Sequence, residues 1–568
     1  MKADLTRNTF DPAKRFSQVL MQQGRVQLDA DWNEQGSIFL RYLRTLTTDL
    51  VGRASGTPGS FAITPLGISP TPGDDFRISE GHFYVDGILC EAASTPIGIY
   101  PLIPPAADGT VLVDSWTMDG IELQDAAWSP QQGVSYLELF DDIDGANPPR
   151  AAEFAPVLVK ITSFNKANGK ITIDALPDIS APARPKLRRL FTYLHQPGFV
   201  FSNQPNNPVP PALVAPAQVY LDVWERLITY LEDDAIREVA LGGPDTATRA
   251  QVVWQVRITP ALADGSCMSV AQLNALLQPP NRGYLKARAK QGSQSTDPCI
   301  INPTANYHGA ENQLYRVEIN RSGAAWDGGD AGESTAATFK WSRENGSVAF
   351  AISSGGGTGQ LVLESLGRDG RFGLSVGDWV EVQDDSSVLL SRPGTLLQVH
   401  SIDTGSLTVM LDGTPDPTVG NNPALHPVLR RWDLQAGDPA EGGLTLGSDN
   451  AALVQEGTWL ELEDGVQVLF QPSVPGSLAQ SYRTADYWMI PARTATGDVE
   501  WPRMMTAGGA LDTDAGGNPI PLSLPPHGVT HHYAPLGVVS IPPRGHGLNA
   551  GDPCSESFPT LVELESGR

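Results

Sequence analysis

The stretch that decides the fold is His82-Phe-Tyr-Val-Asp-Gly-Ile-Leu-Cys-Glu91. Two short apolar runs flank Asp86-Gly87, and the two central positions of a type I′ turn need the positive φ angles that Asp and Gly tolerate. We therefore predict a β-hairpin of two antiparallel strands over these ten residues.

The same signal recurs along the chain. Further Asx-Gly pairs lie between short apolar runs at Asn168-Gly169 (157–161 and 170–173), Asn345-Gly346 (338–342 and 347–350) and Asp464-Gly465 (460–463 and 466–470). Repeated hairpin signals at short spacing are typical of antiparallel sheets in sandwiches and small barrels. The predicted fold class is therefore mainly β, a multidomain series of antiparallel β-sandwich and small-barrel modules with an N-terminal helical attachment segment.

Helical periodicity is confined to a few segments. Asp29 or Asp31 can cap an amphipathic helix over about 31–51, with Gly52 at its C-cap, and short helices are expected near 269–278 and over 12–22. A proline-rich run at 203–211 and the basic run 184–189 suggest a domain boundary. The predicted domains are 1–55 (a strand-turn-helix attachment element), 75–200 (β), 212–365 (central β), 370–415 (a small SH3- or OB-like barrel) and 425–568 (C-terminal β).

Strand alternation over 314–319 and 338–343 assigns side chains to two faces. Tyr315, Val317, Ile319, Phe339 and Trp341 are predicted to form a core. On the opposite face, Arg316, Glu318 and Lys340 are predicted to point outward as exposed cross-strand partners. The functional alternative is that Glu311, Glu318 and Arg343 line a cleft and carry acid/base chemistry.

The charge of the chain limits its partners. Its 568 residues include 64 acidic and 39 basic side chains, a net charge of −25, and such a surface repels phosphate backbones. Nucleic acid is therefore an unexpected partner. The polar N-terminus and the lack of an apolar run long enough to cross a bilayer predict no signal peptide and no membrane span. We expect a cytoplasmic assembly that leaves a cell only as part of a larger particle.

Searches for reactive or metal-binding motifs give weak candidates. Cys267 and Cys299 are the most attractive disulfide pair, with isolated buried thiols as the alternative. His527, His531 and His532 form the densest histidine cluster, and the loops 512–518 and 141–145 resemble incomplete calcium loops. We therefore predict no catalytic residues, no metal and no cofactor. Tryptophans in predicted strands are expected to be core residues, with a carbohydrate platform as the alternative for a minority.

One long stretch and four blocks carry a family resemblance. The opening Phe10-Asp-Pro-Ala-Lys-Arg-Phe-Ser-Gln-Val-Leu-Met-Gln-Gln-Gly-Arg-Val-Gln-Leu-Asp-Ala-Asp-Trp-Asn-Glu-Gln35 resembles the start of an uncharacterised bacterial family and, more distantly, of some phage tail proteins. The blocks 220–226, 238–249, 311–319 and 339–346 look like further parts of the same family.

Some members of that family look associated with phage-tail-like contractile injection systems. The resemblance implies a non-enzymatic structural part of such a particle, in its baseplate or as an appendage, which is expected to form homo-oligomers with other subunits as partners. Docking is expected through Phe10, Asp11, Pro12, Arg25, Leu28, Trp32, Asn33, Phe39 and Tyr42. The alternatives are a carbohydrate- or cell-surface-binding β module and a hydrolase with an unrecognised site.

Overall fold

The protein, described by a computed structural model, clusters into two compact units, each assembled from separated stretches of the chain. Unit 1 comprises Met1–Leu43, Trp224–Gln251 and Asn274–His531, and unit 2 comprises Arg44–Val223, Val252–Leu273 and His532–Arg568. The structure describes residues 1–65, 75–102, 108–119, 121–123, 137–143, 151–179, 183–197, 216–278, 281–291, 306–332, 334–439, 442–474, 476, 478–540 and 549–558. The proline-rich run 203–211 lies outside them.

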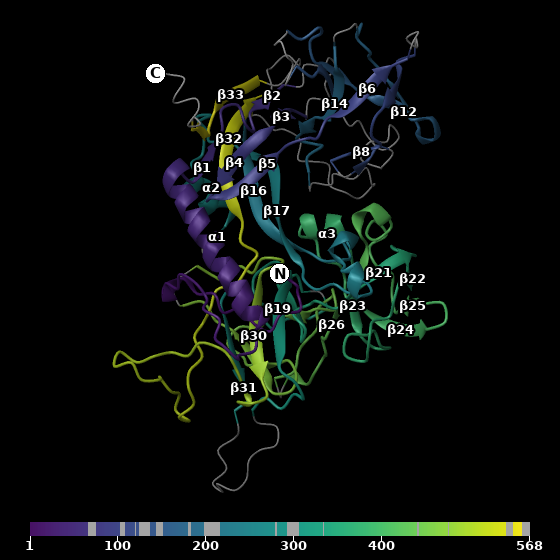
Figure 1. Ribbon diagram of the computed structural model, residues 1–568. Coiled ribbons are helices and arrows are strands. Elements are labelled where there is room, and N and C mark those ends of the chain that lie inside the picture. Colours follow the sequence, from purple (N-terminus) through teal and green to yellow (C-terminus); the bar gives the residue numbers. More distant parts are fainter. Residues whose placement is uncertain are drawn as a thin grey trace. The chain divides into compact units, whose positions relative to one another are not determined.

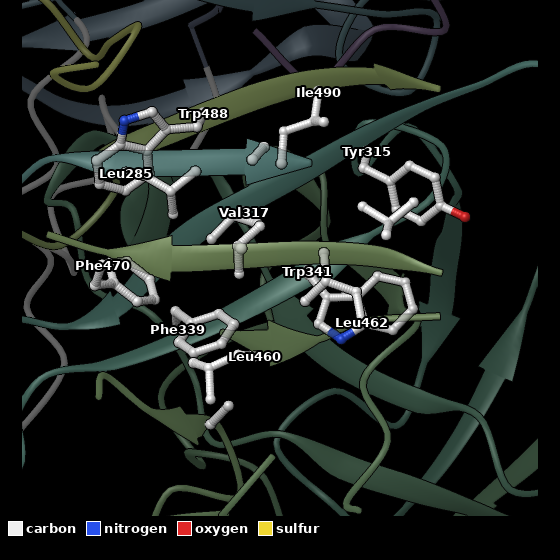
Figure 2. Close-up of a cluster of buried hydrophobic side chains, with 14 of the residues drawn as sticks. Leu285, Tyr315, Val317, Phe339, Trp341, Leu460, Leu462, Phe470, Trp488 and Ile490 are labelled. Carbon is white, nitrogen blue, oxygen red and sulfur yellow. The ribbon is translucent and has the colours of Figure 1, made fainter. Parts of the chain in front are cut away.

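The core of unit 1 is built on a five-stranded sheet of order β27-β20-β19-β30-β31. Its strands are Ala452–Leu453 (β27), Thr338–Ser342 (β20), Gln313–Arg321 (β19), Tyr487–Arg493 (β30) and Asp498–Val499 (β31). Val317 of the central strand lies opposite Trp341 on one side and Trp488 on the other. The five predicted core side chains are each at most 1% exposed, and Figure 2 shows four of them, Tyr315, Val317, Phe339 and Trp341, in the buried cluster. The predicted apolar face is confirmed.

A three-stranded sheet adds to the same core. It consists of Leu285–Ala289 (β18), Val466–Phe470 (β29) and Leu460–Glu461 (β28). Asp464 and Gly465 have φ angles of 47° and 80° between β28 and β29, which pair antiparallel. This predicted hairpin is confirmed.

Unit 1 also contains a closed six-stranded barrel, whose labelled strands Figure 1 shows gathered together. In barrel order the strands are Ala349–Ser354 (β21), Gln360–Leu363 (β22), Thr408–Leu411 (β25), Leu397–Asp403 (β24), Trp379–Gln383 (β23) and Val428–Trp432 (β26). The segment 370–415, expected to hold the whole barrel, contains three of these six strands. The others come from before and after it.

The strands that flank Asn345-Gly346 do not pair with each other, contrary to the prediction. Both turn residues have positive φ, but β20 stays in the five-stranded sheet while β21 enters the barrel. The Asn345 side-chain amide donates hydrogen bonds to the carbonyl oxygens of Met1 (3.0 Å) and Ala3 (2.8 Å). The turn is therefore a corner between two sheets, fixed by a distant part of the chain.

Unit 2 contains a seven-stranded sheet of order β11-β10-β14-β6-β7-β13-β12. Its strands are Val157–Val159 (β11), Leu137–Asp141 (β10), Pro185–Arg189 (β14), Ile97–Pro101 (β6), Thr110–Val113 (β7), Lys170–Ile173 (β13) and Ile161–Asn165 (β12). A hairpin is present at Asn168-Gly169, but it joins β12 and β13, whereas most of the predicted first strand 157–161 is β11, which pairs with β10. The basic run 184–189 is strand β14 and not a linker, because Arg188 pairs with Glu138 on the adjacent β10.

The remaining strands form smaller sheets. One four-stranded sheet contains Ala54–Gly56 (β1), Gly81–Val85 (β4), Ile88–Ala92 (β5) and Glu556–Ser557 (β34), and another contains Ala217–Ile228 (β16), Arg249–Pro260 (β17), His532–Ser540 (β32) and Asn549–Pro553 (β33). A three-stranded sheet contains Ile63–Thr64 (β2), Arg77–Ile78 (β3) and Phe191–Thr192 (β15). A two-stranded sheet contains Thr117–Met118 (β8) and Ile121–Glu122 (β9). Asp86 and Gly87 have φ angles of 48° and 77° between β4 and β5. The hairpin from which the fold class was predicted is thus confirmed.

The helices are few. They are Asp29–Val51 (α1), Val270–Leu277 (α2) and Asp385–Leu389 (α3), with short 3-10 turns at Pro12–Lys14, Lys166–Asn168, Asp234–Ile236, Val239–Leu241 and Pro423–Leu425. The helices predicted over 31–51 and near 269–278 are present, and Gly52 ends α1 with a φ of 88°, whereas the expectation of a helix over 12–22 is wrong, since that stretch contains only the 3-10 turn Pro12–Lys14. Within the described residues, none of the helices combines the length and hydrophobicity that crossing a bilayer requires.

Two expectations about chain organisation are wrong. Strand β16, from the expected central domain 212–365, pairs with β32 from the expected C-terminal region 425–568, because edge hydrogen bonds join strands that are distant in sequence. Cys267 is bonded to Cys554, at a Cα–Cα distance of 5.7 Å, and not to Cys299, which lies outside the described residues. Cys90 is a buried free thiol.

Candidate functional sites

The predicted docking segment differs from the expected strand-turn-helix. Residues 1–28 contain no strand; their one regular element is the 3-10 turn Pro12–Lys14, where the Asp11 side chain accepts a hydrogen bond from the backbone of Ala13 at 2.9 Å. Pro12 and the apolar residues that follow it do not pair with any strand that the structure describes. The segment is therefore an extended arm that leads into α1.

Polar side chains at the start of α1 hold this arm. The Asp29 carboxylate accepts a 2.9 Å hydrogen bond from the Thr6 backbone, and Glu34 accepts one of 2.6 Å from the Thr9 hydroxyl. Further along the arm, the backbone of Val19 donates to Gln35 at 2.7 Å. Only Ala30 and Ile38 of the helix are buried, so the arm covers a polar strip and little apolar area.

The apolar side chains of the arm and of α1 remain exposed. We define the N-terminal apolar surface as Phe16, Leu20, Met21, Val26, Leu28, Trp32, Phe39, Leu40, Tyr42 and Leu43, all of them between 45% and 82% exposed. Trp32, Phe39 and Leu43 recur at helical spacing along α1. Of the nine predicted docking residues, Phe10 and Asp11 are half-buried and the other seven are exposed.

The stretch 10–43 that carries this surface is neutral, with four basic and four acidic side chains, on a chain that is acidic overall. Residues 12–43 carry four basic side chains, Lys14, Arg15, Arg25 and Arg41, and all four are exposed. Their three acidic side chains include Asp29 and Glu34, which are hydrogen-bonded to the arm. The surface is therefore apolar with a basic rim, on a chain that is acidic overall.

A second feature of unit 1 is a cavity of about 1060 Å³. Its wall includes Lys2 from the arm, Arg316 and Glu318 from β19, Lys340 from β20 and Arg430 from β26. Arg316, Glu318 and Lys340 are at most 3% exposed. The prediction that these three side chains face solvent is wrong, because residues of the arm and of the barrel cover that side of the sheet.

The buried charges are paired in a network. Glu318 accepts a 2.6 Å hydrogen bond from Arg316 Nε and lies 3.0 Å from Lys2 Nζ, while Lys340 Nζ lies 2.5 Å from a carboxylate oxygen of Glu381 on β23. Burial acts to raise the pKa of Glu318, but Lys2, Arg316 and Lys340 outweigh it and hold that pKa well below its ordinary value. Sequence reasoning missed Glu381 and Lys2, which no local pattern connects to β19.

The comparisons with known proteins find one family. Its model, described as a family of unknown function, DUF6519, matches residues 1–115, 211–279 and 261–545. The chain belongs to DUF6519. The DUF6519 match contains the arm, the N-terminal apolar surface and every cavity-lining residue. No curated protein matches the chain, and no solved structure does.

The histidine cluster does not converge in this DUF6519 protein. His527 Nδ1 accepts a hydrogen bond from the backbone of Met489 at 3.0 Å, the ring of His531 lies against Trp224, and His532 pairs with Asp86 at 2.8 Å. Each histidine thus has a different partner. Of the seven tryptophans predicted to be core residues, Trp224, Trp254, Trp341, Trp488 and Trp501 are buried, whereas Trp379 and Trp459 are half-buried.

The acidic side chains of the two loops are hydrogen-bonded to backbone groups, Asp514 within its own loop and Asp141 to distant residues. Asp514 accepts hydrogen bonds from the backbones of Gly516 and Asn518, and Asp141 accepts them from Glu153 and Arg184. Residues 144 and 145 of the second loop lie outside the described part. Among the residues that the structure describes, no group of three or more His, Cys, Asp or Glu side chains is placed to hold a metal ion.

Proposed function

We propose that the protein is a structural, non-enzymatic subunit of a phage-tail-like contractile injection particle and docks through its N-terminal apolar surface onto a second copy of the same chain. The observation that carries the docking is the exposure of the ten apolar side chains, with Trp32 at 82% and Tyr42 at 72%. Clustered large apolar side chains of this kind mark interaction surfaces. The particle itself is proposed from the family resemblance of the opening sequence.

Charge supports a second copy as the occupant. The rim of the surface is formed by Lys14, Arg15, Arg25 and Arg41, whereas the whole chain has 64 acidic and 39 basic residues. A basic rim on one copy therefore meets a predominantly acidic body on another, and complementary charge favours correct pairing. Aromatic and arginine side chains are also the residue types enriched at protein interfaces.

The solution mass of the purified protein tests the docking. We expect the wild type to be oligomeric by light scattering, and the triple variant Trp32→Ser/Phe39→Ser/Tyr42→Ser to be monomeric with an unchanged circular dichroism spectrum. The matched control Val376→Ser/Met505→Ser/Leu511→Ser removes three side chains that are 51–63% exposed elsewhere in unit 1, and it should stay oligomeric.

A wild-type monomer, or a triple variant with the mass of the wild type, would contradict docking onto a second copy. For the particle, we expect the wild type to sediment with tail-like particles from its host and the triple variant to stay in the supernatant. Recovery of both proteins in the supernatant would refute the particle assignment.

A further inference from the structure

The cavity in unit 1 is lined by seven Lys and Arg side chains and six Asp and Glu side chains. Four cationic side chains, Lys2, Arg316, Lys340 and Arg430, meet the two buried carboxylates Glu318 and Glu381. Each of the first three lies within 3.0 Å of one of these carboxylates. Arg430 does not.

Arg430 is held by neutral groups. Its Nε donates to Gln383 Oε1 at 2.8 Å and its Nη1 donates to the carbonyl of Gly346. Within the described part of the chain, no carboxylate lies at ion-pair distance from it. A guanidinium has five N–H donors, so three remain beyond these two bonds. Burial lowers the pKa of Arg430, while the carboxylates of Glu232, Glu381 and Glu318 act in the opposite direction.

Lys2 stands next to Arg430. A Cβ at Gly346, whose carbonyl Arg430 binds, would lie 3.5 Å from Cδ of Lys2. Burial, together with the charges of Arg430, Arg316 and Lys340, lowers the pKa of Lys2 to about 8 against the attraction of Glu318. The acidic side chain that acts most strongly on Arg430 is Glu232, which lines the cavity and accepts hydrogen bonds from Thr229.

We propose that this cavity binds a small organic anion, whose phosphate or carboxylate oxygens contact Arg430 and Lys2. Oxyanions match the planar fork of a guanidinium, and such charge-assisted hydrogen bonds are stronger than neutral ones. The volume of about 1060 Å³ exceeds what an inorganic ion fills, and Trp224, Phe350 and Tyr487 in the wall offer apolar contacts to an organic body. Trp32 of the N-terminal apolar surface also lines the cavity, but Lys2 and Arg430 are not part of that surface.

Binding of inorganic phosphate and of succinate, measured by titration calorimetry with sodium chloride at equal ionic strength as the reference, tests the proposal. We expect at least one of the two anions to bind the wild type and the Arg430→Gln variant to bind it about tenfold more weakly or worse. The two probes separate a phosphate-bearing ligand from a carboxylate-bearing one.

The chain offers a matched control for this variant. Arg288 on β18 also donates from Nε to a glutamine, Gln467, and lies outside the cavity. Arg288→Gln should therefore bind the anion as the wild type does.

A second variant, expected to strengthen anion binding where Arg430→Gln weakens it, keeps the test decisive if Arg430→Gln does not fold. Glu232→Gln removes the negative charge that faces Arg430, while its amide oxygen can still accept from Thr229, so the anion should bind several-fold more tightly. The proposal is overturned if neither anion binds the wild type above the chloride reference, if Arg430→Gln binds like the wild type, or if Glu232→Gln binds more weakly.

Discussion

Tryptophan side chains are usually buried and lysine side chains are usually exposed, but Trp32 and Lys340 show the reverse. Trp32 on α1 is 82% exposed, whereas Lys340 on β20 is 1% exposed. The lysine is satisfied within the chain, because Glu381 lies 2.5 Å away. The tryptophan has no equivalent cover in a single copy. The difference teaches that a buried charge can be stabilised by partners within the same chain, whereas an exposed cluster of apolar side chains indicates contact with another molecule.

The largest expected effect comes from the apolar side of the same sheet. Trp341→Ala removes a fully buried indole from the unit 1 core, and such truncations cost about 3–5 kcal/mol. Denaturant unfolding measures the change in the free energy of unfolding. A cost below about 1 kcal/mol would show that β20 does not pack as described.

The charged side of the sheet should be nearly as sensitive. Glu318→Gln leaves Lys2, Arg316 and Lys340 with one carboxylate fewer, and breaking a buried ion pair costs about 3–5 kcal/mol. Glu461→Gln is the matched control, since Glu461 pairs with Lys290 at a site where both side chains are about one-third exposed and the cost should stay under about 1 kcal/mol. Equal costs for the two variants would remove the distinction between this network and an ordinary surface pair.

The pH dependence of stability probes Lys2 in the same network. Its pKa falls from 10.5 to about 8 in the folded state, chiefly through burial, so above pH 8 the unfolded state binds more protons than the folded state. Stability therefore rises with pH in this window. Relative to Lys2→Met, the wild type should gain about 1–2 kcal/mol between pH 8 and 9.5, because all other titrating groups are shared. Parallel stability curves would place Lys2 in solvent.

The smallest effect on stability is expected at the exposed tryptophan. Trp32→Ser should change the unfolding free energy of the monomer by less than about 0.5 kcal/mol, since surface substitutions away from packed features rarely cost more. Replacing a tryptophan should therefore change the free energy of unfolding strongly at the buried position 341 and hardly at all at the exposed position 32. A loss of several kcal/mol at Trp32, measured under conditions that keep the protein monomeric, would show that the arm or the helix packs over it.

Local patterns predicted the local structure well. The hairpin at 82–91 and that at 460–470 follow from turn chemistry that needs only neighbouring residues. Alternation likewise identified the core face of β19 and β20, because a period of two is a property of the strand itself. Helix α1 was expected for similar reasons of spacing and capping.

Features that depend on distant residues were missed. The charged face of β19 is buried because Lys2 and Glu381 cover it, and neither is near β19 in sequence. Gly346 has the positive φ of a hairpin turn, yet contacts of Asn345 with the start of the chain make that turn a corner. The partner of Cys267 is Cys554, 287 residues away, which sequence spacing gave no reason to choose.

The ion pair of Lys2 with Glu318 also changes how the arm should be tested. Since Lys2 and Ala3 are part of the unit 1 interior, deletion of residues 1–52 would remove core contacts together with the docking surface. Substitutions confined to exposed side chains such as Trp32 separate the two roles.

The Cys267–Cys554 bond has a mechanical consequence. The longest continuous segment of unit 1, Asn274–His531, lies wholly inside the covalent loop that this bond closes. Tension applied to the two ends of the chain would pass through the disulfide and bypass that segment. When pulled from its ends, the oxidised protein should thus extend about 95 nm less than the reduced protein, at roughly 3.3 Å for each of the 287 residues of the loop. The oxidised chain would keep much of unit 1 folded under loads that unravel everything outside the loop.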